Sequence, residues 1–444
     1  MQKDLTKGSI FKNLAVFSLP FFLSYFLQTL YGLADLFIIG QFNGSDAITA
    51  VSIGSQIMHM LTVIIVGLAM GTTVMISRSV GAKKEKEVSQ AIGNSITMFG
   101  IVAIVLCIVL ILLITPIVTV MSTPIEAVEQ TKIYLLICFG GIPFIIAYNI
   151  ISAIFRGLGD SKSPMYFVAV ACVVNIALDY LFIGVFDMRA AGAALGTVIS
   201  QTISVIFAVI SITKGKNKIH ISKKNLKPDR TMMGHILKIG VPVSLQDGFV
   251  QISFIIITII ANSRGVEIAA AVGIVEKIIS MLFLVPSSML SAVSSLAAQN
   301  MGAGLHKRAT KTLEYGIGIT VAFGIFFSIV IQFAAKPLIG AFTSDAAVVI
   351  YGVQYLKSYV FDCIFAGIHF CFSGYFCAYG KSMLSFIHNI TSILLVRIPG
   401  AYFASILFPA TLFPMGCAAP AGSLLSAIIC VGAFIWMRKK KLNV

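Results

Sequence analysis

The sequence contains little charge. Only 11% of its 444 residues are Asp, Glu, Lys or Arg, whereas 58% are hydrophobic. Soluble domains are typically about 25% charged, and a soluble fold of this length has too little interior to bury so much apolar surface. The lack of charge therefore excludes a soluble protein and predicts that much of the surface faces lipid.

The apolar runs also lack polar interruptions. The run 101–120 is continuous, whereas the strands of a membrane barrel alternate between apolar and polar residues. A helix of about 20 apolar residues crosses the hydrocarbon core. The sequence therefore predicts an all-α integral membrane protein of twelve transmembrane helices. We place them at 14–41, 47–76, 92–115, 130–153, 165–186, 190–213, 236–262, 268–298, 312–335, 347–377, 383–408 and 414–437.

Motifs for metal, redox and nucleotide chemistry are missing. The eight cysteines include no C-x-x-C pair, which is typical of buried free thiols. We find no H-x-x-x-H or paired-aspartate motif, so we expect no catalytic residue, no structural metal and no cofactor. The stretch from Gly374 to Ser382 resembles a phosphate loop, but its spacing is wrong and no strand precedes it. Any pumping must then use an ion gradient or a partner ATPase.

Positive charge is distributed unevenly along the chain. The net charge is +15, and 25 of the 32 Lys and Arg residues lie in the terminal segments or in every second loop. The intervening loops hold only four. Because basic loops stay on the cytoplasmic side, both termini are expected to be cytoplasmic. This bias explains the net charge without a nucleic-acid partner.

The chain contains an internal repeat. Three motifs recur at offsets of 221 or 222 residues: Leu19-Pro20 with Val241-Pro242, 79–83 with 300–304, and Phe155-x3-Gly159-x-Ser161 with Phe376-x3-Gly380-x-Ser382. Six spans per half bring both halves in from the same side, so their pseudo-two-fold axis lies along the membrane normal. We predict an N-lobe at 1–213, a cytoplasmic basic linker at 214–234 and a C-lobe at 235–444.

Five acidic residues lie inside predicted spans, where charge is costly. They are Asp35, Asp179, Asp247, Glu276 and Asp362. Such a group either marks a functional site or lies near a helix end and pairs with a neighbour. We expect Glu276 to be neutralised by Lys277, and Arg397 to require an acidic partner.

Depth distinguishes two of these acids. Asp35 and Asp179 share a predicted depth with Tyr134 and Thr197, roughly 5–11 Å below the outer boundary. Asn175 lies one helical turn from Asp179. We therefore predict one internal polar site in the first half. Two carboxylates in a low-dielectric interior repel each other, so this site is expected to take up a proton or to bind Na⁺.

Two further features bear on this site. The second half has no matching acid pair, because the repeat places Ile256 or Ile257 opposite Asp35 and Gly400 opposite Asp179. Pro20 lies inside the first helix, where proline frees backbone carbonyls and permits bending. That bend is either a gate linked to Asp35 or a static kink.

Taken together, the motifs resemble those of the multidrug and toxic compound extrusion (MATE) transporters. The resemblance covers nearly the whole chain and rests on the repeat and on seven motifs. They are Pro20, Gly32-Leu33-Ala34-Asp35, Ile39-Gly40, Val80-Gly81-Ala82, Arg156-Gly157-x-Gly159-Asp160, Asn175-x3-Asp179 and Arg397-x-Pro399.

The resemblance implies a function. Members of the family have two six-helix lobes that face alternately inward and outward, and they export cationic and amphipathic compounds in exchange for H⁺ or Na⁺. It implies a monomer in the bacterial plasma membrane, in contact with lipids. In the N-lobe branch of the family the cation-responsive network matches Asp35, Tyr134, Asn175, Asp179 and Thr197, and the bending proline matches Pro20.

The resemblance implies less for the second half. Other branches carry a glutamate about two turns after the proline of helix 7, where this chain has Val250 beside Gln251. Asp362 matches their helix 10 acid. A C-lobe site would therefore rest on Asp362, Asp247 and Gln251 without the usual glutamate.

Three other functions agree less well with the sequence. A flippase for lipids or lipid-linked saccharides of the same superfamily would need cationic residues along its cavity, and only Arg397 and Lys277 lie deep in predicted spans. A membrane enzyme would need a catalytic cluster near one face of the membrane. A channel is disfavoured by the two-lobe repeat with buried acids.

Overall fold

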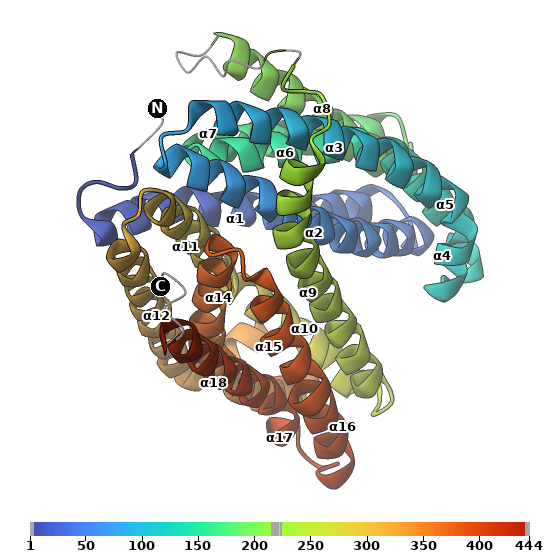
Figure 1. Ribbon diagram of the computed structural model, residues 1–444. Helices are drawn as coiled ribbons and strands as arrows, with labels where there is room; N and C mark the ends of the chain where they lie inside the picture. Colours follow the sequence, from blue (N-terminus) through green and yellow to red (C-terminus); the bar gives the residue numbers. More distant parts are fainter. Residues whose placement is uncertain (1–3, 215–221, 223, 440–444) are drawn as a thin grey trace. The chain divides into compact units, whose positions relative to one another are not determined.

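The computed structural model describes residues 4–214, 222 and 224–439, and every regular element among them is a helix (Figure 1). Part of the predicted basic linker, residues 215–221 and 223, lies outside the described residues. The helices on either side of this gap make up twelve candidate spans, as predicted from the continuous apolar runs.

The described residues before the gap form ten helical elements. They are α1 (Ile10–Phe42), α2 (Ser45–Gly81), α3 (Glu85–Leu112), α4 (Ile114–Val120), the 3₁₀ turn η1 (Ile125–Ala127), α5 (Val128–Gly140), α6 (Ile142–Gly157), α7 (Lys162–Asp179) and the π-helical η2 (Tyr180–Val185), and α8 (Arg189–Lys214) closes this half.

The second half repeats this plan. Its elements are α9 (Arg230–Asn262), α10 (Val266–Leu282), α11 (Leu284–Gly302), α12 (His306–Gly340), α13 (Ala346–Tyr359), α14 (Asp362–Ala378), α15 (Ser382–Ser392), the π-helical η3 (Ile393–Arg397), α16 (Ile398–Leu407), α17 (Phe413–Gly416) and α18 (Ala418–Lys439).

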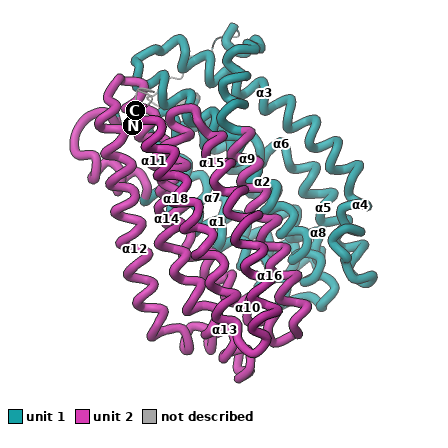
Figure 2. Tube along the Cα trace, turned by 60° about the horizontal axis from the view of Figure 1, so that its bottom comes forward, with its two compact units in different colours: residues 1–4, 19–240 teal, residues 5–18, 241–444 magenta. Residues whose placement is uncertain are grey.

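The chain divides into two compact units (Figure 2). Unit 1 comprises residues 1–4 and 19–240, and unit 2 comprises residues 5–18 and 241–444. The division crosses α1 between Ser18 and Leu19 and α9 between Gly240 and Val241, next to Pro20 and Pro242. Equivalent prolines therefore stand where each long helix passes from one unit into the other.

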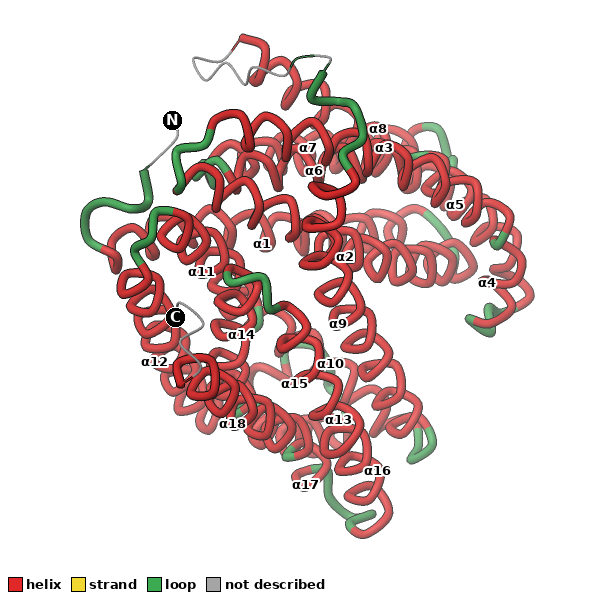
Figure 3. Tube along the Cα trace, in the orientation of Figure 1, coloured by secondary structure: helices red, strands yellow, loops and turns green. Residues whose placement is uncertain are grey.

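The helices are long and apolar enough for a twelve-span membrane protein. Ten helical segments among the described residues pass this test singly, and two bent pairs complete the set (Figure 3). The prediction of twelve transmembrane helices is confirmed. Many large apolar side chains are exposed, such as Leu112, Val120 and Phe333, as expected for a surface that faces lipid.

The two bent spans occupy equivalent places in the repeat. The segment Ile125–Gly140 meets Ile142–Gly157 at 48°, and Ala346–Tyr359 meets Asp362–Ala378 at 42°. In the first pair, Gly141 separates the helices and Pro143 stands in the first turn of α6, where its missing N–H is tolerated. Sequence analysis predicted each pair as one uninterrupted span and did not anticipate the bends.

A π-helical segment interrupts the fifth and eleventh spans. The first, η2, directly follows Asp179, and the second, η3, ends at Arg397. Such segments widen the helix by one residue per turn and are frequent at functional sites. Both of these charged residues therefore stand at a local change of helical geometry.

Candidate functional site

Asp35 and Asp179 meet inside unit 1. Asp35 lies in the C-terminal half of α1 and is 3% exposed, while Asp179 is the last residue of α7 and is fully buried. Their carboxyl groups lie close enough to interact directly, although neither oxygen of Asp179 has a well-formed hydrogen bond. Two ionised carboxylates have only acceptors, so this contact becomes a hydrogen bond when one of the two groups carries a proton.

Asn175 and Thr197 complete the surroundings of Asp35. Asn175 lies one turn before Asp179 on α7, Thr197 lies on α8, and both approach the Asp35 carboxyl. Yet six polar atoms here are buried without a well-formed hydrogen bond: Asp35 Oδ1, both carboxyl oxygens of Asp179, both amide atoms of Asn175, and Thr197 Oγ1. Buried polar atoms are usually paired, so this cluster has the donors and acceptors to receive an ion or a water molecule.

Tyr134 approaches the site from α5. Its side chain is 2% exposed, its hydroxyl hydrogen-bonds to Ser55 Oγ at 3.2 Å, and it lies within electrostatic range of Asp35. The ring fits only because residue 54 on α2 is glycine, since a Cβ there would lie 2.2 Å from the ring. All five residues predicted for an N-lobe site therefore come together in unit 1.

Sequence analysis missed Gly196. A Cβ at this position of α8 would lie 2.2 Å from Asp179 Oδ1. The glycine therefore makes room for the carboxyl group, and its place next to Thr197 in a helix interior, where glycine is unfavourable, was a usable clue.

Tyr31 and Gln201 were also missed. Tyr31 lies one turn before Asp35 on α1, interacts with it electrostatically and lies close to Gln201 of α8. The spacing of four residues from Asp35 was the available clue.

Pro20 lies inside α1, and the helix continues through it. One turn later, Ser24 Oγ donates to the Pro20 carbonyl oxygen at 2.7 Å. A serine bonded in this way to the preceding turn tends to bend a helix. Bending at Pro20 stays a prediction.

The C-lobe candidates lie in unit 2 and are arranged differently. Asp362 is fully buried at the first position of α14, and neither of its carboxyl oxygens has a well-formed hydrogen bond. Arg397 donates through Nη2 to the Tyr359 hydroxyl at 2.7 Å, and its guanidinium lies 4.7 Å from the centre of the Phe254 ring. Asp362 and Glu276 both act on Arg397 electrostatically.

Arg397, which was expected to need an acidic partner, has two acids within electrostatic range. Both Arg397 and the expected neighbour Lys277 act on Glu276. Asp247 and Gln251 are half-buried on α9. No charged group acts on Asp247 there, so the structure does not join it to this cluster.

In the described part of the chain, no three His, Cys, Asp or Glu side chains gather in one place. The cysteines are all free thiols. A membrane protein of two repeated units with buried, incompletely bonded carboxylates belongs to the class of membrane transporters.

Comparison with known proteins places the chain within that class. The MatE family model matches residues 20–181 and again 242–403, once in each half. The probable multidrug resistance protein YpnP of Bacillus subtilis is 30% identical over 403 residues, which covers 89% of this chain and 88% of that protein. The chain belongs to the MatE family, whose members are transporters rather than enzymes.

Two further comparisons agree. The multidrug export protein MepA of Staphylococcus aureus is 28% identical over 384 residues, covering 84% of this chain and 83% of that protein. An outward-facing structure of a multidrug resistance MATE family transporter of the MOP superfamily aligns with a TM-score of 0.91 at 22% identity, covering 98% and 97% of the two chains. The latter supports the fold.

Proposed function

We propose that this protein is a secondary active multidrug exporter, which expels cationic and amphipathic compounds in exchange for H⁺ or Na⁺. The observation that carries the proposal is the contact between Asp35 and Asp179, surrounded by polar atoms without hydrogen-bond partners. The multidrug relatives named above support the type of cargo.

The carboxyl pair supplies a way to couple the entry of H⁺ or Na⁺ to the export of the compound. Two like charges about 4 Å apart repel by about 4 kcal/mol at an effective dielectric constant of about 20. When the site is closed off from water, one proton or Na⁺ relieves that repulsion. When it opens to the other side, the ion leaves and the negative pair attracts a cationic compound. Ion and cargo thus occupy the site alternately, as exchange requires.

For a neutral cargo molecule, the membrane potential is an adequate driving force without ATP. One charge that crosses 100 mV releases about 2.3 kcal/mol, and each tenfold concentration ratio costs about 1.4 kcal/mol. One ion per neutral cargo molecule therefore supports a ratio of up to roughly fifty.

Flipping of anionic lipid carriers is less well supported. Arg397, the deep cation that such a function needs, is shared by Asp362 and Glu276. The two acids offset the positive charge of Arg397, which disfavours binding of a pyrophosphate there.

The test is uptake of an ethidium-like cation into inverted vesicles, with pH and Na⁺ gradients imposed separately. Asp35→Asn and Asp179→Asn remove charge but little volume, so each is expected to insert normally and to lose gradient-driven transport. Glu126→Gln is the matched control, because Glu126 is an exposed acid in the short turn before α5. Wild-type transport by either aspartate variant at wild-type abundance would refute the proposal.

A further inference from the structure

A polar stripe runs along α1 from the Asp35 site toward the start of the helix. It consists of Ser24, Gln28, Tyr31 and Asp35, which are spaced three or four residues apart. Residues at this spacing share one helix face, and Ser24 lies about 16 Å along the axis from Asp35. The stripe therefore points from the carboxyl pair toward the membrane face that carries the basic loops.

A second stripe lies on α6, within the same unit. Tyr148, Ser152 and Arg156 are spaced four residues apart. Tyr148 is 5% exposed, Ser152 is 2% exposed, and the Tyr148 hydroxyl reaches toward both Ser152 and Gln28 of the first stripe. The two stripes thus connect α1 with α6 through polar side chains in the interior.

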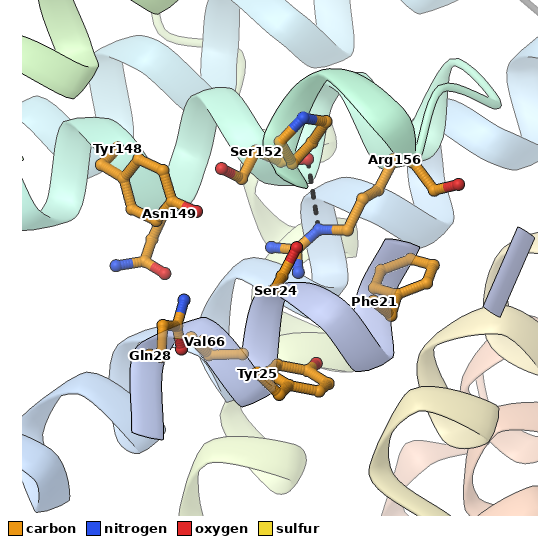
Figure 4. Close-up of a pocket in the computed structure, with 11 residues that line it drawn as sticks. Phe21, Ser24, Tyr25, Gln28, Val66, Tyr148, Asn149, Ser152 and Arg156 are labelled. Atoms are coloured by element: carbon orange, nitrogen blue, oxygen red, sulfur yellow. Dashed lines mark hydrogen bonds between the residues drawn. The ribbon is translucent and has the colours of Figure 1, made fainter. Parts of the chain in front are cut away.

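A small cavity lies between the stripes (Figure 4). It is lined by residues that are mostly polar, namely Phe21, Ser24, Tyr25, Gln28, Val66, Tyr148, Asn149, Ser152, Arg156, Ser161 and Pro164. Its volume of about 20 Å³ exceeds the roughly 10–15 Å³ that one water molecule needs. Ser152 Oγ is buried there without a well-formed hydrogen bond. The cavity has both the space and an unsatisfied polar atom to hold water.

Tyr31 connects this cavity with the carboxyl pair. It lies within electrostatic range of Asp35 on one side and of Tyr148 on the other, and it lies close to Gln201. Gln201 Oε1 is itself buried and has no well-formed bond. Hydroxyl groups donate and accept at once, so Tyr31 and Tyr148, together with water in the cavity, supply the groups that a proton relay from Asp35 needs.

Arg156 stands at the far end of the cavity, in the last turn of α6. Its Nε donates to the Ser152 carbonyl oxygen at 3.2 Å, and its guanidinium lies 5.8 Å from the centre of the Phe21 ring. A guanidinium is always charged. Na⁺ would have to move past this positive charge as an intact ion. A proton, in contrast, is transferred from one oxygen to the next, so no single ion has to travel past Arg156.

We propose that this cavity is a water site through which the Asp35 and Asp179 pair releases protons toward the basic-loop side, and that Arg156 keeps Na⁺ out of it. The inference rests on the proposed function and deepens it, because it makes H⁺ the coupling ion. In the step, a carboxyl group loses its proton to the relay and stays behind as a carboxylate, while the cavity water passes one proton on.

The groups that face Asp35 are consistent with this release. They are Asp179 and Cys172 on α7, Tyr134 and Cys138 on α5, and Tyr31 on α1 itself. None of these groups carries a fixed positive charge that would trap the pair in its ionised form, so the proton can return in the next cycle.

Tyr148→Phe tests the relay, because it removes one hydroxyl and leaves the ring. In inverted vesicles with an imposed pH gradient, we expect transport of the cation to fall about tenfold, the factor that one hydrogen bond typically supports. Binding of the cation to the purified protein should stay at the wild-type level. Tyr166→Phe is the control, since Tyr166 is exposed on α7. Equal transport rates in the two variants would overturn the relay.

Arg156→Gln and the wild type test the exclusion of Na⁺. With pH clamped on both sides, a Na⁺ gradient should drive no transport by the wild type, and Arg156→Lys, which keeps the charge, should behave likewise. Arg156→Gln should acquire Na⁺-driven transport. If Na⁺ drives the wild type while Asp35→Asn is inactive, this inference fails and the proposed function stands. If Asp35→Asn transports normally, the proposed function itself fails.

Discussion

The carboxyl group of Asp179 occupies space that any side chain at residue 196 would need. A Cβ on Gly196 would lie 2.2 Å from Asp179 Oδ1 and 3.6 Å from Asn175 Nδ2. The relationship joins α8 to the end of α7. It fixes the side on which the Asp179 carboxyl can lie and directs it toward Asp35.

Gly196→Ala should therefore impair transport without preventing insertion. The added methyl group must displace the Asp179 carboxyl, and overpacking of this kind typically costs about 1–3 kcal/mol. We expect gradient-driven uptake into inverted vesicles to fall at least about tenfold, which corresponds to about 1.4 kcal/mol.

Gly100→Ala on α3 is the matched control. Nothing lies within 4 Å of a Cβ at this position, and alanine favours a helix interior more than glycine does. If both variants transport at the wild-type rate, the carboxyl position of Asp179 does not matter for transport.

Asp362→Asn and Asp247→Asn should leave substantial transport. When the Asp362 charge is removed, Arg397 still has Glu276 as an acidic neighbour. Desolvation is the one influence on the Asp247 carboxyl, so its substitution breaks no charge pair among the described residues. We expect each variant to retain wild-type transport within a factor of about three, a change of less than 1 kcal/mol. Complete loss at normal membrane abundance would move the coupling site to the C-lobe.

Arg397→Gln should instead destabilise the protein. It removes the base and leaves the buried Asp362 without a cationic neighbour, and breaking a buried charge pair from one side costs about 3–5 kcal/mol. We expect a clear loss of thermal stability in detergent. Adding Asp362→Asn to this variant should recover part of that loss, because one buried charge is then removed. A double variant no more stable than Arg397→Gln would show that the charges are not coupled.

The topology can be checked through a native thiol. Cys417 is exposed between α17 and α18, whereas Cys107 is half-buried and the other six cysteines are buried. The basic bias predicts that this end of the twelfth span faces outward, so an impermeant thiol reagent should label intact cells at Cys417. In a Cys417→Ser background, Asp345→Cys should restore labelling and Lys307→Cys should not. Labelling at residue 307 from outside would reverse the predicted orientation.

Much of this protein is determined by the sequence alone. Continuous apolar runs dictate helices in lipid, because only a helix satisfies its own backbone there. The repeat of Pro20 at Pro242 and the family motifs indicate two related halves, and helical rise places Asp35 and Asp179 at a common depth. These properties depend on local composition and spacing, which a single chain displays directly.

Only the tertiary structure decided which side chains meet. Depth leaves the rotation of each helix open, so the contact between Asp35 and Asp179 and the space made by Gly196 required the packed unit. Asp362 and Glu276, which lie on two other helices, both come within electrostatic range of Arg397. The sequence alone suggested only Lys277, the neighbour of Glu276 in the chain, as a partner for that acid. Such contacts depend on helix rotation and on bends at residues such as Gly141, which arise from packing between distant segments rather than from local sequence.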